Sequence, residues 1–249
     1  MKKIELSKIE IADINMDFGD ESQIYKLSGK EEVYKEWIKT KKINAEVILN
    51  KVRKLEELEK RDDSIFEFLV RPEDLVVDKE KYTGYTMEKY DGEKPSGYLN
   101  YKEAVILLKK IKKAILELEE KGIRYLDLNH SNILYKITDG EINFKIVDID
   151  NAIVDDMEMD LIPPFIYRYL AVGGKLDKNA LIYAYNCLTV RLLSNYDMRL
   201  SGNTFIPNYN RRLAKFGELC DRPQTDTIID NEYLIDSYDE NSNMRMALI

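Results

Sequence analysis

The sequence predicts an α+β protein in which an antiparallel sheet with one main helix is followed by a mainly helical part. The first 90 residues alternate short apolar runs with turn residues, a pattern typical of strands, and contain one stretch of helical periodicity. The second half begins with a long amphipathic helical pattern. Between the two halves, residues 91–99 include glycine, proline and several charged residues, so we expect a linker there.

Strands are expected where short apolar stretches alternate with polar residues and end at turn residues. Residues 22–27 and 31–35 fit this pattern, and the Ser-Gly-Lys sequence at 28–30 predicts a tight hairpin between them. Residues 66–70 and 84–90 are the next two expected strands.

The main helix of the first part is expected to begin after Asn44. Apolar residues recur on one stripe at Ile48, Val52, Leu55 and Leu58, and charged residues lie between them. Asn44 is a suitable N-cap because its short side chain can accept hydrogen bonds from the first free amides of a helix.

Two more helices are expected in the second half. Asn100 and Glu103 have the spacing of a capping box, and the amphipathic pattern that follows them continues to Gly122. Residues 177–193 again have a helical pattern.

A hairpin is expected between these two helices. The alternating runs at residues 133–137 and 142–148 flank Asp139-Gly140, and Asp-Gly between two such runs is a strong hairpin signal. The hairpin would hold the polar loop before it in register with the end of its second strand.

Composition excludes several classes of function. The formal net charge of −8 gives no overall cationic field that would attract nucleic acid or an anionic membrane surface. The two cysteines, Cys187 and Cys220, are too few for a disulfide framework or a cysteine-based zinc site. With no secretory signal at the start and no long apolar run, we expect a cytoplasmic protein with reduced thiols and no membrane partner.

The residues that carry most chemical information lie on both sides of the expected hairpin. Residues 125–134 read YLDLNHSNIL, and residues 145–150 read KIVDID. In this order they resemble the catalytic loop and the metal-binding motif of the protein-kinase-like superfamily. The resemblance implies that Asp127 is the catalytic aspartate and that Asn132 and Asp148 hold the Mg²⁺ bound to ATP.

These residue types suit phosphoryl transfer. Two oxygen ligands on neighbouring loops fit a hard cation that bridges phosphates, and a third carboxylate can orient an attacking hydroxyl. A simpler alternative is that Asp127 and Asn132 cap local turns while Asp148 and Asp150 end a strand near solvent.

The resemblance continues into the first part of the chain. Lys35, in Val-Tyr-Lys at 33–35, resembles the strand lysine that grips the phosphates, and Glu46, early in the next helix, resembles its ion-pair partner. Lys26, one strand earlier, is the competing candidate for the phosphate lysine.

The nucleotide-covering loop and the hinge are the remaining parts of a nucleotide site. Gly19 is the one glycine where the family has a glycine-rich loop, and its neighbours Asp20 and Glu21 would repel phosphate. Met87 would border the adenine pocket, and the backbone groups from Glu88 to Tyr90 would form hydrogen bonds with adenine.

Three departures from the protein-kinase pattern change the expected chemistry. Asn129 replaces a lysine near the transferring phosphate, and His130, the one histidine of the chain, would either supply part of the missing charge or pack as a loop residue. Asp150 replaces the glycine of D-F-G, so the sequence VDID is closer to aminoglycoside and choline kinase-like phosphotransferases. Asp150 is thus a candidate second metal ligand.

The resemblance implies a two-lobed kinase-like fold with ATP and Mg²⁺ as cofactors. The expected parts are an N-lobe at 1–90, a linker at 91–99, a C-lobe at 100–221 and a tail or docking segment at 222–249. The expected partner is a protein or small-molecule hydroxyl acceptor, with no nucleic acid.

Three functions are open from the sequence. The first is a compact Ser/Thr protein kinase of bacterial or viral type. The second is a small-molecule phosphotransferase, favoured by VDID and by the absence of an A-P-E motif. The third is a pseudokinase that binds nucleotide or a protein without turnover.

Overall fold

The computed structural model describes residues 1–18, 21–40, 42–95, 99–171, 173–200 and 233–237. The chain forms two compact units: Met1–Asp91 with Lys145–Leu161, and Gly92–Phe144 with the chain from Ile162 onward. The α+β class expected from the sequence is confirmed. The first break between units falls beside the expected linker. The segment Lys145–Leu161, however, belongs to the first unit, whereas the sequence assigned it to a lobe at 100–221.

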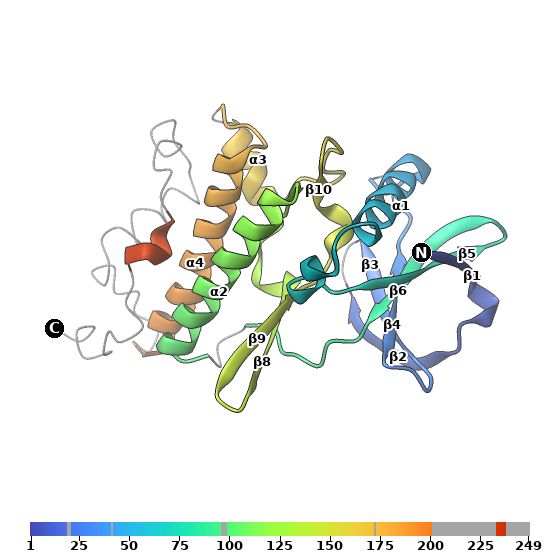
Figure 1. Ribbon diagram of the computed structural model, residues 1–249, viewed down its shortest axis with the longest axis horizontal. Coiled ribbons are helices and arrows are strands. Elements are labelled where there is room, and N and C mark those ends of the chain that lie inside the picture. The colour runs from blue at the N-terminus through green and yellow to red at the C-terminus, as the bar shows by residue number, and fades with distance from the viewer. Residues whose placement is uncertain (19–20, 41, 96–98, 172, 201–232, 238–249) are drawn as a thin grey trace. The chain divides into compact units, whose positions relative to one another are not determined.

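The first unit is built on a six-stranded mixed sheet (Figure 1). The strand order is β1-β5-β6-β4-β3-β2, with parallel pairing between β1 and β5 and antiparallel pairing elsewhere. The expectation of a purely antiparallel sheet is therefore wrong at one edge, where the N-terminal strand lies beside β5. The strands are β1 (Lys2–Glu5), β2 (Ile11–Phe18), β3 (Ser22–Leu27), β4 (Glu32–Trp37), β5 (Pro72–Asp78) and β6 (Lys81–Glu88).

The expected hairpin near the N-terminus is confirmed by the pairing of β3 with β4. Gly29, in the turn, has a φ of 66°, a left-handed conformation that glycine adopts without steric cost. The strand expected at 66–70 is wrong, because Asp63–Glu67 forms a short 3₁₀ helix whose first turn is capped by Asp62. A 3₁₀ helix, Leu6–Lys8, also connects β1 and β2.

Helix α1 (Ala45–Glu59) is the main helix of the first unit and contacts β5. The predicted N-cap is confirmed, since the Asn44 side chain accepts hydrogen bonds from the amides of Glu46 and Val47. The buried face contains the expected apolar stripe together with two lysines: Ile48, Lys51, Val52, Lys54, Leu55 and Leu58.

The segment Lys145–Leu161 runs from the sheet to α1. Ile146 donates its amide to the carbonyl of Phe68 and accepts from the amide of Val70, which ties the start of the segment to the chain before β5. Beyond this point it forms a short 3₁₀ helix, Ile149–Asn151, and strand β10 (Ile153–Val154), both in contact with α1.

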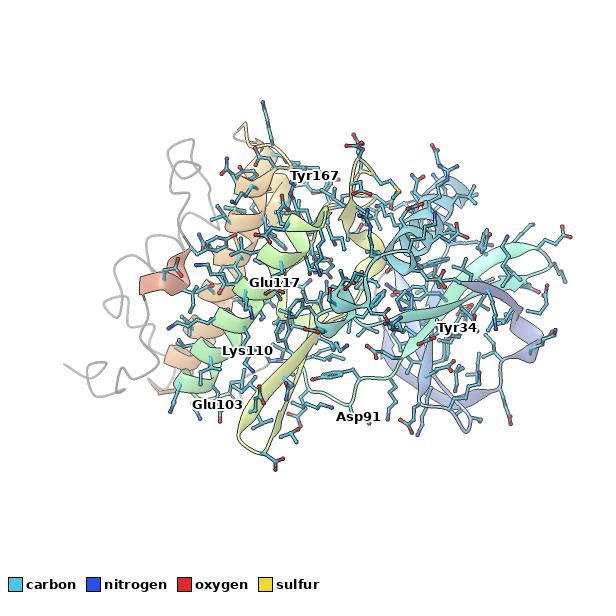
Figure 2. All side chains as sticks on the ribbon, in the orientation of Figure 1. Tyr34, Asp91, Glu103, Lys110, Glu117 and Tyr167 are labelled. Carbon is cyan, nitrogen blue, oxygen red and sulfur yellow. The ribbon has the colours of Figure 1, made fainter. Side chains whose placement is uncertain are left out.

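The second unit is mainly helical. Helix α2 (Tyr101–Glu120) has the predicted capping box between Asn100 and Glu103, and it packs against α4 (Lys178–Leu200) (Figure 1). Figure 2 shows Glu103, Lys110 and Glu117 along α2. The other elements are β7 (Ile123–Arg124), a 3₁₀ helix (His130–Asn132), β8 (Ile133–Thr138), β9 (Glu141–Ile146), α3 (Pro164–Ala171) and a 3₁₀ helix (Leu234–Ser237). Strand β9 ends in the first unit.

The hairpin predicted around Asp139-Gly140 is confirmed by the pairing of β8 with β9. The helix predicted at 177–193 is confirmed as well, and the Asp177 side chain caps α4 by accepting from the amides of Asn179 and Ala180. Helix α3 was not expected. Among the described residues, none of the helices has both the length and the apolar character that a membrane crossing requires.

A short piece of the expected tail contacts the second unit. Ile235 is buried, and the Tyr233 ring meets the Tyr185 ring of α4 edge to face at 5.2 Å. Lys112 of α2 pairs with Asp236 at 2.6 Å and lies over the Tyr233 ring. Residues 233–237 therefore form part of this unit, and the rest of the predicted tail, 222–232 and 238–249, lies outside the described residues.

Candidate functional site

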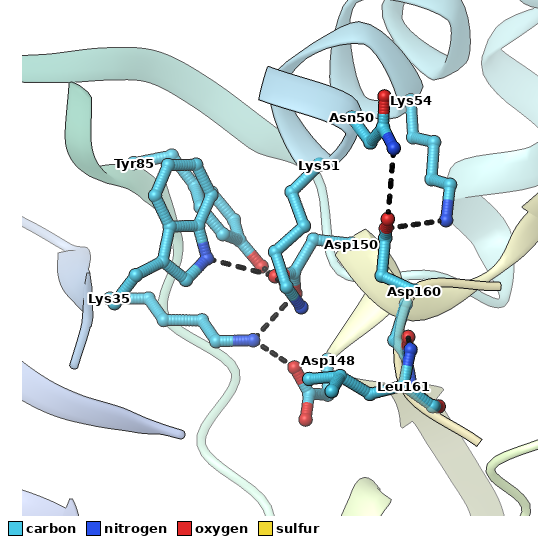
Figure 3. Close-up of polar contacts among 11 residues, drawn as sticks. Lys35, Asn50, Lys51, Lys54, Tyr85, Asp148, Asp150, Asp160 and Leu161 are labelled. Atoms are coloured by element: carbon cyan, nitrogen blue, oxygen red, sulfur yellow. Dashed lines mark hydrogen bonds and ion pairs between the residues drawn. The ribbon is translucent and has the colours of Figure 1, made fainter. Parts of the chain in front are cut away.

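Lys35 is the centre of a buried polar cluster in the first unit. It lies on β4, between antiparallel partners β3 and β6, and its side chain is buried. Its Nζ donates to Asp148 and to Oδ1 of Asp150, the latter at 2.5 Å (Figure 3). The predicted phosphate lysine and a predicted metal ligand, 113 residues apart in sequence, therefore lie in direct contact.

Asp150 is fully enclosed and accepts four hydrogen bonds. Its Oδ1 accepts from Lys35 and from the Tyr85 hydroxyl at 3.3 Å, and its Oδ2 accepts from Trp37 Nε1 at 2.8 Å and from Lys51 Nζ at 2.9 Å. A carboxylate has about four acceptor positions, and in this arrangement all four are used within the protein. Asp150 therefore anchors Lys35, and its predicted role as a second metal ligand gains no support from these contacts.

The charges in this cluster explain why Asp150 stays ionised. Burial alone would disfavour its carboxylate, but the ammonium groups of Lys35 and Lys51 outweigh that effect and hold the pKa of Asp150 well below its usual range. Burial lowers the pKa of Lys35, and the attraction of Asp150 opposes that shift. The two groups stabilise each other in their charged forms.

Asp148 differs from Asp150 in being open on one side. Its side chain is 31% exposed, whereas that of Asp150 is 0% exposed. One oxygen accepts from Lys35, and the other points away from that lysine (Figure 3). The backbone of Asp148 has a φ of 63°, a left-handed conformation uncommon for a non-glycine residue and often found at functional sites. Asp148 is thus the carboxylate of this cluster that could hold a metal ion.

Two lysines of α1 belong to this region and were not predicted from the sequence. Lys51 pairs with Asp150, and Lys54 pairs with Asp160 at 2.7 Å (Figure 3). Asp160 also accepts from Asn50 Nδ2 at 3.3 Å. A signal was present, because Lys51 and Lys54 fall among the apolar positions of the helix, where a charged residue needs a buried partner.

The predicted ion pair between Lys35 and Glu46 is wrong. Glu46 lies exposed in the first turn of α1, next to the N-cap, and the carboxylates that contact Lys35 are Asp148 and Asp150. Lys26, the competing phosphate lysine, is exposed on β3, opposite Val33. Burial and carboxylate contacts therefore distinguish Lys35 from Lys26.

In the second unit, the predicted catalytic loop is held by its own side chains. Asn129 Nδ2 donates to Oδ1 of Asp127 at 2.9 Å, and Asn129 Oδ1 accepts from the amide of Ser131 at 2.8 Å. Asn132 Nδ2 donates to the backbone carbonyl of Asp127 at 3.1 Å. The amide oxygen of Asn132 is then the atom that could hold a cation, and Asn129 orients the Asp127 carboxylate.

The loop is also fixed at its start. Arg124 donates to both carboxylate oxygens of Glu119 and, at 2.8 Å, to the carbonyl of Leu176, just before α4. The 3₁₀ helix that contains Asn132 contacts α4. These contacts give Asp127 a fixed backbone, as a positioned general base requires.

The surroundings of His130 favour its neutral form. Burial lowers its pKa, and the nearby cations Arg191 and Lys94 lower it further. Its Nδ1 is buried and has no hydrogen-bond partner among the described residues. Of the two readings left open by the sequence, that of a packed loop residue agrees with these surroundings.

The predicted adenine-reading segment lies at the end of β6. Met87 is buried in the sheet, and burial raises the pKa of the Tyr90 hydroxyl to about 12. The amides of Glu88 and Lys89 donate to carbonyls of Arg71 and Glu31, so these two amides are used within the unit and are not available to a base. Gly19, the predicted phosphate-loop glycine, lies outside the described residues.

In the described part of the chain, no three His, Cys, Asp or Glu side chains are grouped so as to hold a metal ion. The predicted magnesium ligands, Asn132 and Asp148, come from different units. Comparison with models of protein families finds no match, and comparison with curated proteins finds no similar sequence. The resemblance to protein kinases therefore depends on the motifs and on the contacts described above.

Proposed function

We propose that this protein is an ATP- and Mg²⁺-dependent phosphotransferase that transfers the γ-phosphate to a hydroxyl group, as a Ser/Thr protein kinase-like enzyme. The observation that carries the proposal is the contact of the buried Lys35 with Asp148. A buried strand lysine in contact with an aspartate that follows a distant hairpin is the arrangement that a phosphate and metal site of this kind requires.

The charges of the cluster suit a polyphosphate. Lys35 and Lys51 bring two positive charges, and the enclosed Asp150 neutralises one of them. Asp148 is partly exposed and would hold Mg²⁺ through one oxygen, whereas Lys35, kept in place by Asp150, would contact phosphate oxygens. Catalysis of this kind depends on positioning and charge neutralisation.

The resemblance assigns the acceptor side of the reaction to the loop at 125–134. Asp127 would accept the proton of the attacking hydroxyl, with its carboxylate oriented by Asn129. The Asn132 amide oxygen would be a further metal ligand. Mg²⁺ would supply neutralisation of the negative charge of the phosphates.

A small-molecule acceptor is the second candidate. It is favoured by the short segment between Asp148 and the start of α3 at Pro164, which leaves little chain for a peptide platform. The VDID sequence at 147–150 points the same way.

The test is transfer of labelled phosphate from ATP with Mg²⁺, first to the protein itself and generic protein substrates and then to a set of hydroxyl-bearing small molecules. Labelling of protein is the expected result, and transfer to small molecules alone would select the second candidate. If neither occurs but nucleotide binds, the protein is a pseudokinase and the proposed activity is overturned.

A further inference from the structure

Three lysines are buried among the described residues, and all three pair with carboxylates of one short segment. The pairs are Lys35 with Asp148 and Asp150, Lys51 with Asp150, and Lys54 with Asp160. A buried lysine is rare in proteins and needs a buried partner. The segment that carries the candidate metal ligand is therefore tied to the sheet and to α1 by charge as well as by apolar packing.

The two lysines of α1 are three residues apart, so they project from the same face of the helix (Figure 3). Lys51 reaches Asp150, two residues after Asp148, and Lys54 reaches Asp160, at the far end of the segment. The Lys54 and Asp160 side chains are 1% and 4% exposed. Helix α1 thus contacts the part of the segment from Asp150 to Asp160 at each end of that part.

The segment is also closed on itself. Asn151 Nδ2 donates to the carbonyl of Leu161 at 2.8 Å, and the amide of Leu161 donates to Asn151 Oδ1 at 3.1 Å. This pair of bonds joins the residue after Asp150 to the residue after Asp160. A displacement at either lysine pair would therefore be passed along the whole segment to Asp148.

We propose that Lys51 and Lys54 are positioning residues: through Asp150 and Asp160 they lock the segment 148–161 onto α1 and so fix the place of Asp148. The catalytic meaning of this lock rests on the proposed function. Apolar contacts alone tolerate small sliding movements of a helix, whereas separating a buried ion pair is costly, because each partner then becomes a buried unpaired charge. These ion pairs form without phosphorylation of the protein. They make the position of Asp148 depend on the position of α1.

The test is Lys54→Met, which keeps the length of the side chain and removes its charge. Its matched control is Lys60→Met, because Lys60 lies at the end of α1 and forms an exposed pair with Glu57. The first measurement is amide hydrogen exchange of residues 149–161 without nucleotide, and the second is Mg-ATP affinity. In Lys54→Met we expect exchange about tenfold faster or more and affinity lower by about 10–100-fold, the range for residues that orient a metal ligand. Lys60→Met should match wild type, and Lys54→Arg should recover most of the affinity.

Unchanged exchange in Lys54→Met overturns the lock. Faster exchange with wild-type Mg-ATP affinity overturns the positioning role and leaves a merely structural pair. If Lys54→Met does not fold, Asp160→Asn replaces it, since this isosteric change also breaks the ion pair. The same exchange rates and the same Mg-ATP affinity are then expected of Asp160→Asn. If wild type binds no Mg-ATP, the proposed function fails, while the exchange measurement still decides whether α1 locks the segment.

Discussion

Asp150 is the residue on which the buried cluster depends most. It accepts from Lys35, Lys51, Trp37 and Tyr85, and it is completely enclosed. Removing one member of a buried ion network leaves the others as uncompensated charges, which costs more than the loss of the contacts themselves. The stability of the first unit should therefore be unusually sensitive to this one carboxylate.

The change Asp150→Asn should lower the free energy of unfolding by about 3–5 kcal/mol, because it removes the only fully buried charge that Lys35 and Lys51 share. Urea unfolding followed by circular dichroism measures the loss. Asp148→Asn is the matched control, and since Asp148 is partly exposed its loss should be nearer to about 1 kcal/mol. Equal losses in the two variants would show that Asp150 is not the anchor of the cluster.

The proposed function assigns Asp127 to a different step, the transfer of the phosphate. Because Asn129 and Asn132 hold the loop by hydrogen bonds that Asp127→Asn largely preserves, this variant should keep ATP affinity close to wild type. The rate of phosphate transfer should fall by roughly a hundredfold or more, the loss expected when a general base is removed. Single-turnover transfer at saturating ATP measures it. Transfer at the wild-type rate would remove Asp127 from the catalytic step.

Among single residues, the sequence singled out some members of the cluster and missed others. Lys35 and Asp148 were chosen from their resemblance to kinase motifs, and they are in contact, while their roles in phosphate and metal binding stay predictions. Lys51 and Lys54 were missed because helical periodicity was traced through the apolar residues alone, although both lysines occupy the same buried face. Glu46 was assigned by analogy, and its place beside the N-cap leaves it exposed.

At the scale of elements, the place of Lys35 is set by the contact between β4 and β6. Gly84 of β6 lies opposite Glu36, and a Cβ added there would overlap the carbonyl oxygen of Lys35 and approach the Tyr34 ring. Glycine is required at this point because the two backbones approach closely.

The change Gly84→Ala should therefore push β4 away from β6 and displace Lys35. We expect a loss of about 3 kcal/mol in the free energy of unfolding, the upper part of the range for overpacking. Lys81→Ala, at the exposed start of the same strand, should stay within about 0.5 kcal/mol of wild type. Urea unfolding of both variants tests this, and a Gly84→Ala protein as stable as Lys81→Ala would contradict the close approach of the strands.

Elements were predicted well where local signals are strong. The caps of α1 and α2, the Ser-Gly-Lys turn and the Asp-Gly hairpin each have a side-chain or backbone preference that acts over four residues or fewer. The strand expected at 66–70 failed because a short stretch of apolar residues around one glutamate also suits the end of a 3₁₀ helix, and Asp62 caps the start of that helix. The parallel pairing of β1 with β5 is a contact between distant residues that no local pattern encodes.

For the whole molecule, the sequence predicted the class and the position of the first boundary between units, but not that the chain returns to the first unit at Lys145–Leu161. That return depends on the buried lysine pairs and on the contacts of Ile146, which are visible only in the folded chain. It places the candidate metal ligand Asp148 in the same unit as Lys35, the candidate phosphate lysine, where the two form one charged cluster.

The most direct test of this account is calorimetric titration of ATP into wild type, Lys35→Met and Lys26→Met, each with Mg²⁺ and with a chelator. We expect wild-type binding to require Mg²⁺, and Lys35→Met to weaken it about tenfold or more, the loss of one charge-assisted contact. The exposed Lys26 should be replaceable without effect. Binding by wild type that is indifferent to Mg²⁺, or a greater loss in Lys26→Met than in Lys35→Met, would contradict the assignment of Lys35 and Asp148 to a phosphate and metal site.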